Sequence, residues 1–169
     1  MSGIMKIGIL SDTHNHLHNL QKAMGVFERE HVDLLVHCGD FTQVETLQWL
    51  CEYRLVCAFG NGDFAYGELL GMLKGFQPQN MGGFGCYFEL GGKRMGVTHG
   101  HIPRILDEML HSDLDYVFTG HTHRRQNQRI GHTRVINPGA LGGTHYQSRS
   151  VCILDLETEV PIFEEIQEK

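Results

Sequence analysis

Short aliphatic runs alternate with amphipathic segments along the first third of the chain. The runs cover residues 7–10, 32–38 and 55–59, and each stops at turn-forming residues. A brief apolar run bounded in this way is typical of a strand that is buried on both faces of a sheet. Apolar residues between the runs recur at helical spacing, as at Leu17 and Leu20. The pattern therefore predicts a βαβαβ order, with parallel strands joined by right-handed crossovers.

The remainder of the chain is predicted to be richer in strands. Two apolar arms joined through Gly91 and Gly92 indicate a hairpin, and Pro103 is placed to open a helix. The predicted strands of this part cover residues 84–90, 94–98, 116–118, 126–130, 134–136, 150–156 and 160–165. Within residues 64–82, Glu68–Leu73 could form a short helix, but glycines and Pro78 interrupt this stretch, so we expect an irregular connection there. Thr42 and Glu45 match a capping box, which predicts a helix start at that point.

These elements predict an α/β fold in which two mixed sheets pack together with helices outside. The chain has 169 residues, enough to bury a core of its own. We find no internal repeat and no linker, and we therefore expect one domain over residues 1–169.

Composition excludes several classes of function. The formal charge is −6 and the basic residues are scattered, which argues against a dedicated nucleic-acid surface. No apolar stretch approaches the roughly 20 residues of a membrane span, and the amino terminus lacks a secretory hydrophobic region. Cys38, Cys57, Cys86 and Cys152 lie in strand-like runs and are expected to be buried and reduced. We therefore expect a cytoplasmic protein that does not bind membranes.

Polar residues that can bind metals follow five of the predicted strands. They are Asp12 with His14, Asp40, Asn61, His99, and His121 with His123. The carboxyl ends of strands are where open α/β sheets bind their ligands. Each residue alone has an ordinary explanation: Asp12 as a helix cap, Asp40 as part of a turn, or His99 as a core histidine. Their recurrence at successive strand ends favours a shared site.

The chemistry of this set favours two metal ions. Four imidazoles, two carboxylates and one amide without a thiolate suit Mn²⁺, Fe, Zn²⁺ or Ni²⁺ rather than a structural cysteine-rich zinc site. This number of ligands exceeds what one ion normally takes from a protein. It fits two ions about 3.5–4 Å apart that share a carboxylate.

The motif series D-x-H, G-D, G-N-x-D, T-H-G and G-H-T-H resembles that of the calcineurin-like metallophosphoesterase superfamily. It is most similar to the small bacterial and archaeal phosphodiesterase branch, and the resemblance extends from Ser11 to Gly139. The resemblance implies a four-layer α/β/β/α sandwich and two divalent ions, with Mn²⁺ expected before Ni²⁺, Zn²⁺ or Fe. It also implies the ligand sets: Asp12, His14 and His123 for one ion, Asn61, His99 and His121 for the other, and Asp40 as the bridge.

The implied activity is hydrolysis of phosphate esters, above all of small phosphodiesters, by in-line attack of a hydroxide that bridges the two ions. Asp40, Asn61, Asp63 and His99 are the expected catalytic residues, with Asp63 orienting the site from behind the ligands. Many relatives carry a histidine in the third motif that assists the leaving group, and Gly62 stands there in this chain. We therefore expect a preference for diesters with acidic leaving groups and weak action on alkyl monoesters.

Other histidines near the motifs could in principle replace the missing one. His16 and His101 each follow a predicted ligand by two residues, and surface exposure is the favoured expectation for both.

Two alternative functions stay open. The same fold occurs in a eukaryotic retromer-associated scaffold subunit that has lost most metal-dependent activity, although that lineage departs at several ligand positions that are all present here. A histidine-rich pH sensor or metal store fits less well, because its histidines need not follow successive strands. The sequence also leaves open the physiological substrate and whether the chain forms a homo-oligomer.

Overall fold

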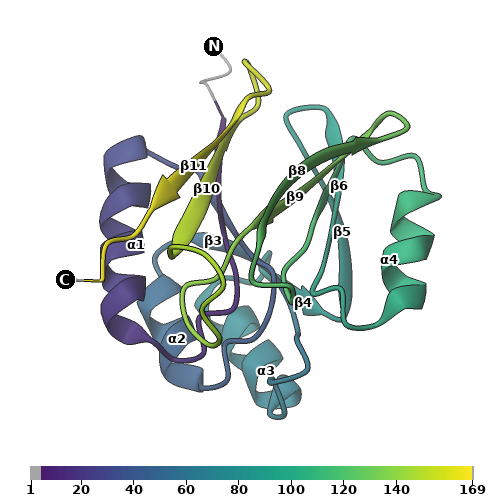
Figure 1. Cartoon of the computed structure of the whole chain (residues 1–169). Coiled ribbons are helices and arrows are strands. Elements are labelled where there is room, and N and C mark those ends of the chain that lie inside the picture. The colour runs from purple at the N-terminus through teal and green to yellow at the C-terminus, as the bar shows by residue number, and fades with distance from the viewer. Residues whose placement is uncertain (1–4, 169) are drawn as a thin grey trace.

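The computed structural model describes residues 5–168, and within them four helices and eleven strands form four layers (Figure 1). The first sheet has the strand order β11-β10-β1-β2-β3-β4, and the second has the order β5-β6-β7-β9-β8. The strands of the first sheet are β1 (Lys6–Leu10), β2 (Leu34–His37), β3 (Arg54–Ala58), β4 (Met81–Gly83), β10 (Ser150–Asp155) and β11 (Pro161–Glu165). Those of the second are β5 (Gly85–Leu90), β6 (Lys93–Thr98), β7 (Tyr116–Phe118), β8 (Arg125–Ile130) and β9 (Thr133–Pro138).

Both sheets are mixed, as predicted. Strands β1 to β4 run parallel to one another, whereas β10 pairs antiparallel with β1. In the second sheet β6, β7 and β9 are parallel, and β5 and β8 pair antiparallel at its two edges. The helices α1 (Leu17–Glu30), α2 (Val44–Leu50) and α3 (Tyr66–Phe76) cover the first sheet, and α4 (Pro103–Leu110) covers the second (Figure 1).

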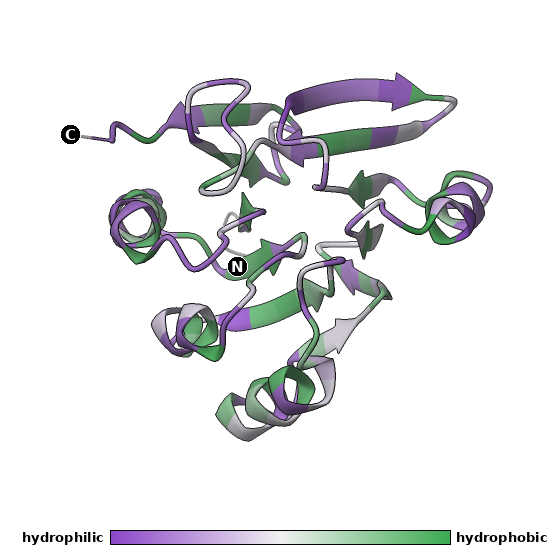
Figure 2. Cartoon of the chain, turned by 60° about the horizontal axis from the view of Figure 1, so that its bottom comes forward, coloured by the Kyte–Doolittle hydropathy of each residue, from purple (hydrophilic) through white to green (hydrophobic). Residues whose placement is uncertain are grey.

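Three apolar clusters hold the four layers together. One lies between the two sheets, and the others lie between each sheet and its helices. Strand β1 shows how the sequence builds this arrangement, since Ile7 and Ile9 belong to the cluster between the sheets while Leu10 belongs to the helical side. At Gly8 a β-carbon would lie 2.7 Å from the ring of Phe27, so glycine lets α1 pack closely on the sheet. In Figure 2 the strands in the interior are mostly hydrophobic, and the helices around them combine hydrophilic with hydrophobic residues.

The expected irregular connection over residues 64–82 was wrong, because α3 and β4 occupy most of it. Gly67, Gly71 and Gly75 are exposed, with open space around each, and they lie four residues apart on one side of the helix. The opposite side buries Leu69 and Leu73 against the first sheet. Helix stability comes mainly from packing of an apolar face, which here outweighs the low helix propensity of glycine.

The predicted capping box at Thr42 is also wrong. Helix α2 begins at Val44, and its N-cap, Gln43, makes no side-chain capping bond. Thr42 instead has a φ of +67°, and its backbone N–H donates to Oδ1 of Asp63 over 2.9 Å. The residue therefore belongs to the polar loops at the end of the sheets rather than to the helix.

The expectations for the cysteines are confirmed. Cys38, Cys57, Cys86 and Cys152 are buried and free. Among residues 5–168 there is also no helix of the length and apolar character that crossing a membrane requires.

Candidate metal centre

The seven predicted ligands all lie in loops at one end of the two sheets, the lower end in Figure 1. Asp12 and His14 follow β1, Asp40 follows β2 and Asn61 follows β3, all in the first sheet. The second sheet contributes His99 after β6, and His121 and His123 after β7. Since β1, β2 and β3 are parallel to one another, as are β6 and β7, each sheet presents its strand ends together.

The first group gathers around one carboxylate. Oδ1 of Asp12 lies 3.1 Å from Nε2 of His123 and 3.7 Å from Nε2 of His14. The donor atoms of these three residues all lie within 4.8 Å of one another, the spacing of ligands around a single ion. The structure thus brings together the three side chains that were predicted to share the first ion.

Asp40 lies between the two predicted sets of ligands. Its Oδ2 atom is 3.5 Å from Nε2 of His14 and 3.4 Å from Nε2 of His99. A carboxylate at similar distances from an imidazole of each set is placed as a bridging ligand would be.

The second set is less compact. Asn61 Oδ1 lies 3.1 Å from Nε2 of His99, while the ring centre of His121 lies 5.1 Å from that of His99. Asp12, Asp40 and His99 also form a group with donor atoms within 4.8 Å. Asn61 and His121 are exposed, so this side of the centre is open to solvent.

Several ligand residues have a backbone conformation that side chains seldom adopt. The φ angles are positive at Asp12, His14, Asp40, His121 and His123, between +46° and +70°. Non-glycine residues in this region cost about 1–3 kcal/mol each and persist where the surrounding structure enforces them. Strain concentrated on five of seven predicted ligands indicates that the loops are shaped to direct these side chains inward.

Backbone carbonyls orient two of the imidazoles. Nδ1 of His99 lies 2.7 Å from the oxygen of Cys38, and Nδ1 of His123 lies 2.8 Å from the oxygen of Thr144. A carbonyl oxygen can only accept, so Nδ1 carries the proton and Nε2 presents its lone pair to the centre. This arrangement is common behind histidines that bind metals.

The charges at the centre fit cations. Burial raises the pKa of Asp12, but the neighbouring imidazoles of His123 and His14 outweigh this effect and hold the pKa well below its usual range. Oδ1 of Asp12 and Nε2 of His14 are buried, and neither has a hydrogen-bond partner among residues 5–168. Buried polar atoms are normally paired, so two unpaired donor atoms aimed at one point fit the coordination of an ion.

Asp63 lies behind the predicted ligands and contacts the loops that carry them. Its Oδ2 accepts hydrogen bonds from the backbone N–H groups of Asp40, over 2.8 Å, and Gly60, over 2.7 Å. It is buried, and it joins the loop after β2 to the loop after β3. It therefore fixes the relative position of Asp40 and Asn61.

His37 is a supporting residue that the sequence did not reveal. It is fully buried at the end of β2, where Nδ1 accepts from the N–H of Gly39 and Nε2 donates to Oγ1 of Thr13. It joins the two loops that carry Asp12 and Asp40. Nothing in the apolar run of β2 distinguishes this histidine from an ordinary packing residue.

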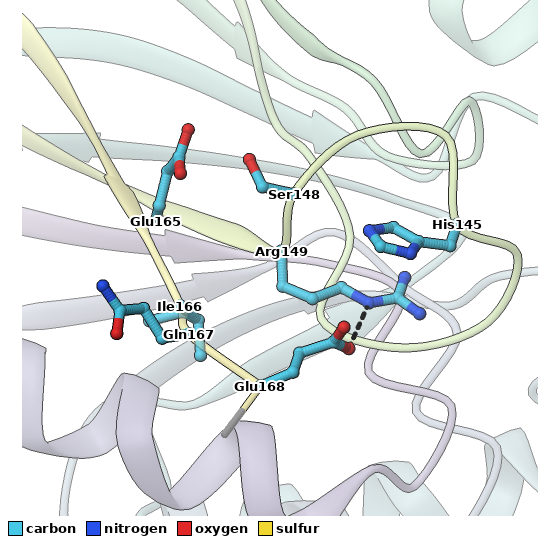
Figure 3. A pocket seen from close by; sticks show the side chains of 7 residues that line it. All are labelled: His145, Ser148, Arg149, Glu165, Ile166, Gln167 and Glu168. Atoms are coloured by element: carbon cyan, nitrogen blue, oxygen red, sulfur yellow. Dashed lines mark hydrogen bonds and ion pairs between the residues drawn. The ribbon is translucent and has the colours of Figure 1, made fainter.

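Arg149 was also missed. This buried side chain donates to the backbone oxygens of Gly142 and Gly143, each over 2.9 Å, and its Nε donates to Glu168 over 3.0 Å. Figure 3 shows Arg149 and Glu168 side by side along a pocket that also includes His145. The contacts to Gly142 and Gly143 cannot be predicted from the sequence, because their acceptors are backbone atoms.

The two histidines considered as replacements have different surroundings. His16 is exposed, as expected, and its Nδ1 accepts from the N–H of Asn19 at the start of α1. His101 is half-buried, which the sequence did not predict, and its ring lies 5.3 Å from that of His99 and 6.3 Å from that of His121. Gly62 leaves the corresponding place in the third motif without a side chain.

Comparison with known proteins agrees with this geometry. Residues 5–159 match the family described as the calcineurin-like phosphoesterase superfamily domain. The chain is 35% identical over 156 residues to Phosphodiesterase MJ0936 of Methanocaldococcus jannaschii, covering 90% of this chain and 94% of that protein. A solved structure of an archaeal phosphodiesterase superimposes with a TM-score of 0.88 at 33% identity, covering 95% of this chain and 99% of that one.

A more distant structure shares the fold alone. The structure of the E. coli phosphoesterase YfcE aligns with a TM-score of 0.68 at 20% identity. The alignment covers 96% of this chain and 100% of that one. The four-layer arrangement predicted from the sequence is thus found in solved metallophosphoesterase structures. From the family match and the identity over nine-tenths of its length, the chain belongs to the calcineurin-like phosphoesterase superfamily.

Proposed function

We propose that this chain is a phosphodiesterase that uses two divalent cations, Mn²⁺ first among them. The observation that carries the proposal is the position of Asp40, whose Oδ2 lies 3.5 Å from His14 and 3.4 Å from His99. One carboxylate between two groups of imidazoles is the arrangement that a pair of ions requires. The similarity to an archaeal phosphodiesterase over most of both chains supports the choice of diesters.

The roles of the side chains follow from their positions. Asp12, His14 and His123 would hold one ion, Asn61, His99 and His121 the other, and Asp40 both. Cations bound there would neutralise phosphate oxygens and make water acidic enough to supply a nucleophile near neutral pH.

The open side of the centre is where a substrate would enter. Asn61 and His121 are exposed, whereas Asp12 and His99 are fully buried. Asp63 accepts hydrogen bonds from the backbone of Asp40 and of Gly60, the residue before Asn61, and so holds these two loops together. Asp63 itself is buried. The buried residues thus form the rigid floor of the site, and a phosphate would approach from the side of Asn61 and His121.

The experiment is a turnover assay combined with a measurement of bound metal. Protein stripped with a chelator and then reloaded with Mn²⁺ should bind two equivalents and hydrolyse bis(p-nitrophenyl) phosphate, with both properties absent before reloading. Parallel assays with Ni²⁺, Zn²⁺ and Fe²⁺ would rank the metals. Protein that takes up no metal and leaves the diester intact would contradict the proposal and favour the scaffold alternative.

A further inference from the structure

Several aromatic side chains lie exposed beside the candidate metal centre. Tyr66 is 52% exposed and Phe84 is 36% exposed, and their ring centres lie 5.5 Å apart. The ring of Phe59, which is only 2% exposed, lies beside both: its centre is 6.4 Å from that of Tyr66 and 6.1 Å from that of Phe84, which it meets edge to face. Large aromatic faces open to water are costly to leave uncovered, and together they form an apolar surface.

This surface continues into the metal centre through His101. The ring of Phe84 lies 6.2 Å from the ring of His101, which in turn lies 5.3 Å from the ring of His99. Nδ1 of His101 is buried and makes no hydrogen bond to any of residues 5–168. A series of ring contacts therefore leads from the predicted ligand His99 outward to Tyr66.

The backbone fixes these rings relative to the ligands. Phe59 comes directly before Gly60 and Asn61, and its N–H donates to the oxygen of Gly83 over 2.8 Å. The oxygen of Phe84 accepts from Oγ1 of Thr98, the residue before His99, over 2.9 Å. The aromatic surface is thus tied to the loops that carry Asn61 and His99, so little ordering would be needed when a ligand binds.

We propose that Tyr66, Phe84 and His101 form an aromatic platform for the base of a nucleoside ester whose phosphate lies at the metal centre. Because the rings of Tyr66 and Phe84 are inclined to each other by 63°, the base would stack on the exposed face of one ring and meet the other along its edge. The proposal rests on the proposed function and assigns it a substrate class, small phosphodiesters of nucleosides. A base offers a planar π face that stacks on aromatic rings. The net charge of −6 and the scattered basic residues disfavour a long polyanion, so a small nucleotide fits better than a nucleic-acid strand.

A pair of ligands that differ only in the base isolates the platform. Adenosine 5′-monophosphate and ribose 5-phosphate carry the same sugar and phosphate, and their affinities for the Mn²⁺-loaded protein can be measured by calorimetry. The adenine nucleotide should bind about 5- to 100-fold more tightly, the range that stacking of one base supplies. Equal affinities would overturn the platform.

Variants test which rings are responsible. Tyr66→Leu combined with Phe84→Leu keeps an apolar cover over Phe59 but removes the π faces, and it should bring the two affinities within about twofold of each other. Phe84→Trp should keep the difference. Tyr87, an equally exposed tyrosine on β5 beside Asp113 and Leu114, is the matched control, and Tyr87→Leu should behave like the wild type. A preserved preference in the double variant would show that the rings only cover Phe59.

The outcome separates this inference from the proposed function. If the protein hydrolyses bis(p-nitrophenyl) phosphate with Mn²⁺ but binds the two ligands equally, the proposed function is supported and the aromatic platform is contradicted. If the protein binds neither ligand and hydrolyses no diester, both the proposed function and the platform are contradicted.

Discussion

The guanidinium of Arg149 donates a hydrogen bond to the backbone oxygen of Gly143 over 2.9 Å. Gly143 has a φ of +67°, and a β-carbon there would lie 2.6 Å from the ring of His14 and 2.7 Å from the ring of His123. The glycine therefore fills the narrow space between two predicted ligands. Through this hydrogen bond Arg149 holds the segment that keeps those two rings in place.

Replacing Arg149 should weaken metal binding as well as the fold. Arg149→Ala leaves the buried carbonyl oxygen of Gly142 without its donor, which should lower the free energy of unfolding by about 1–3 kcal/mol. Loss of support behind ligands typically lowers metal affinity about 10- to 100-fold. Calorimetric titration with Mn²⁺ and urea unfolding measure the two effects. Arg149→Lys should recover part of the affinity, and Arg29→Ala, which removes an exposed arginine paired with Glu164, should change neither.

Asp40→Asn should abolish turnover and reduce the number of bound ions. An amide keeps the size of the side chain but loses the negative charge that would lie between two cations. We expect the rate on bis(p-nitrophenyl) phosphate to fall by at least about 100-fold, since losing a ligand costs more than losing its support. Metal content after dialysis and initial rates check this, and an unchanged rate would exclude Asp40 as the bridge. Asp33→Asn, a substitution on the loop between α1 and β2, serves as the control.

Gly62→His should widen the range of leaving groups. A β-carbon at Gly62 would lie 3.1 Å from Oδ1 of Asp40 and 3.2 Å from Cγ2 of Thr42, so a side chain fits after shifts of a few tenths of an ångström. An imidazole there could protonate a departing alkoxide, an effect typically worth about 10²–10⁴-fold. We expect the wild type to hydrolyse bis(p-nitrophenyl) phosphate faster than an alkyl phosphomonoester. The variant should narrow that ratio, and Gly62→Ala, which adds the crowding alone, should not.

His37 should make the metal-free fold sensitive to acid. Burial lowers the pKa of His37 to about 3 from its usual value of 6.5. Below pH 6.5 the unfolded chain takes up a proton that the folded chain does not, so stability falls between about pH 6.5 and pH 3, by about 1.4 kcal/mol per pH unit. Urea unfolding in chelator at pH 7 and pH 5 should show the wild type losing about 2 kcal/mol more than His37→Gln. Equal losses would exclude His37 as the cause.

The sequence was informative wherever a signal is local. Each predicted ligand follows a strand that is recognisable from its own apolar run, so Asp12, Asp40 and His99 could each be placed at the carboxyl end of a strand without knowledge of the packing. The two-sheet arrangement and the helices α1, α2 and α4 follow from the same pattern of apolar residues. The solved relatives confirm this fold.

The failures come from interactions between distant segments. Helix α3 is stabilised because Leu69 and Leu73 pack against the first sheet. The glycines within this segment lower its helix propensity, so the sequence alone does not predict the helix. Apart from Glu168, Arg149 binds backbone oxygens, and since every residue has one, no residue type identifies those partners. His37 is one member of an apolar run, and its function depends on two loops that the sequence does not show to be adjacent.

The donor atoms of the candidate centre are divided between the two sheets, which come together through the apolar cluster between them. A slip of one sheet across the other would separate Asp40 from His99 even if every strand stayed intact. Substitutions among residues such as Val36 and Phe118, remote from any phosphate, could therefore silence the protein without altering its helical or strand content. Variation in that interior is a second route, besides loss of the ligands themselves, by which a relative with this architecture can cease to be an enzyme.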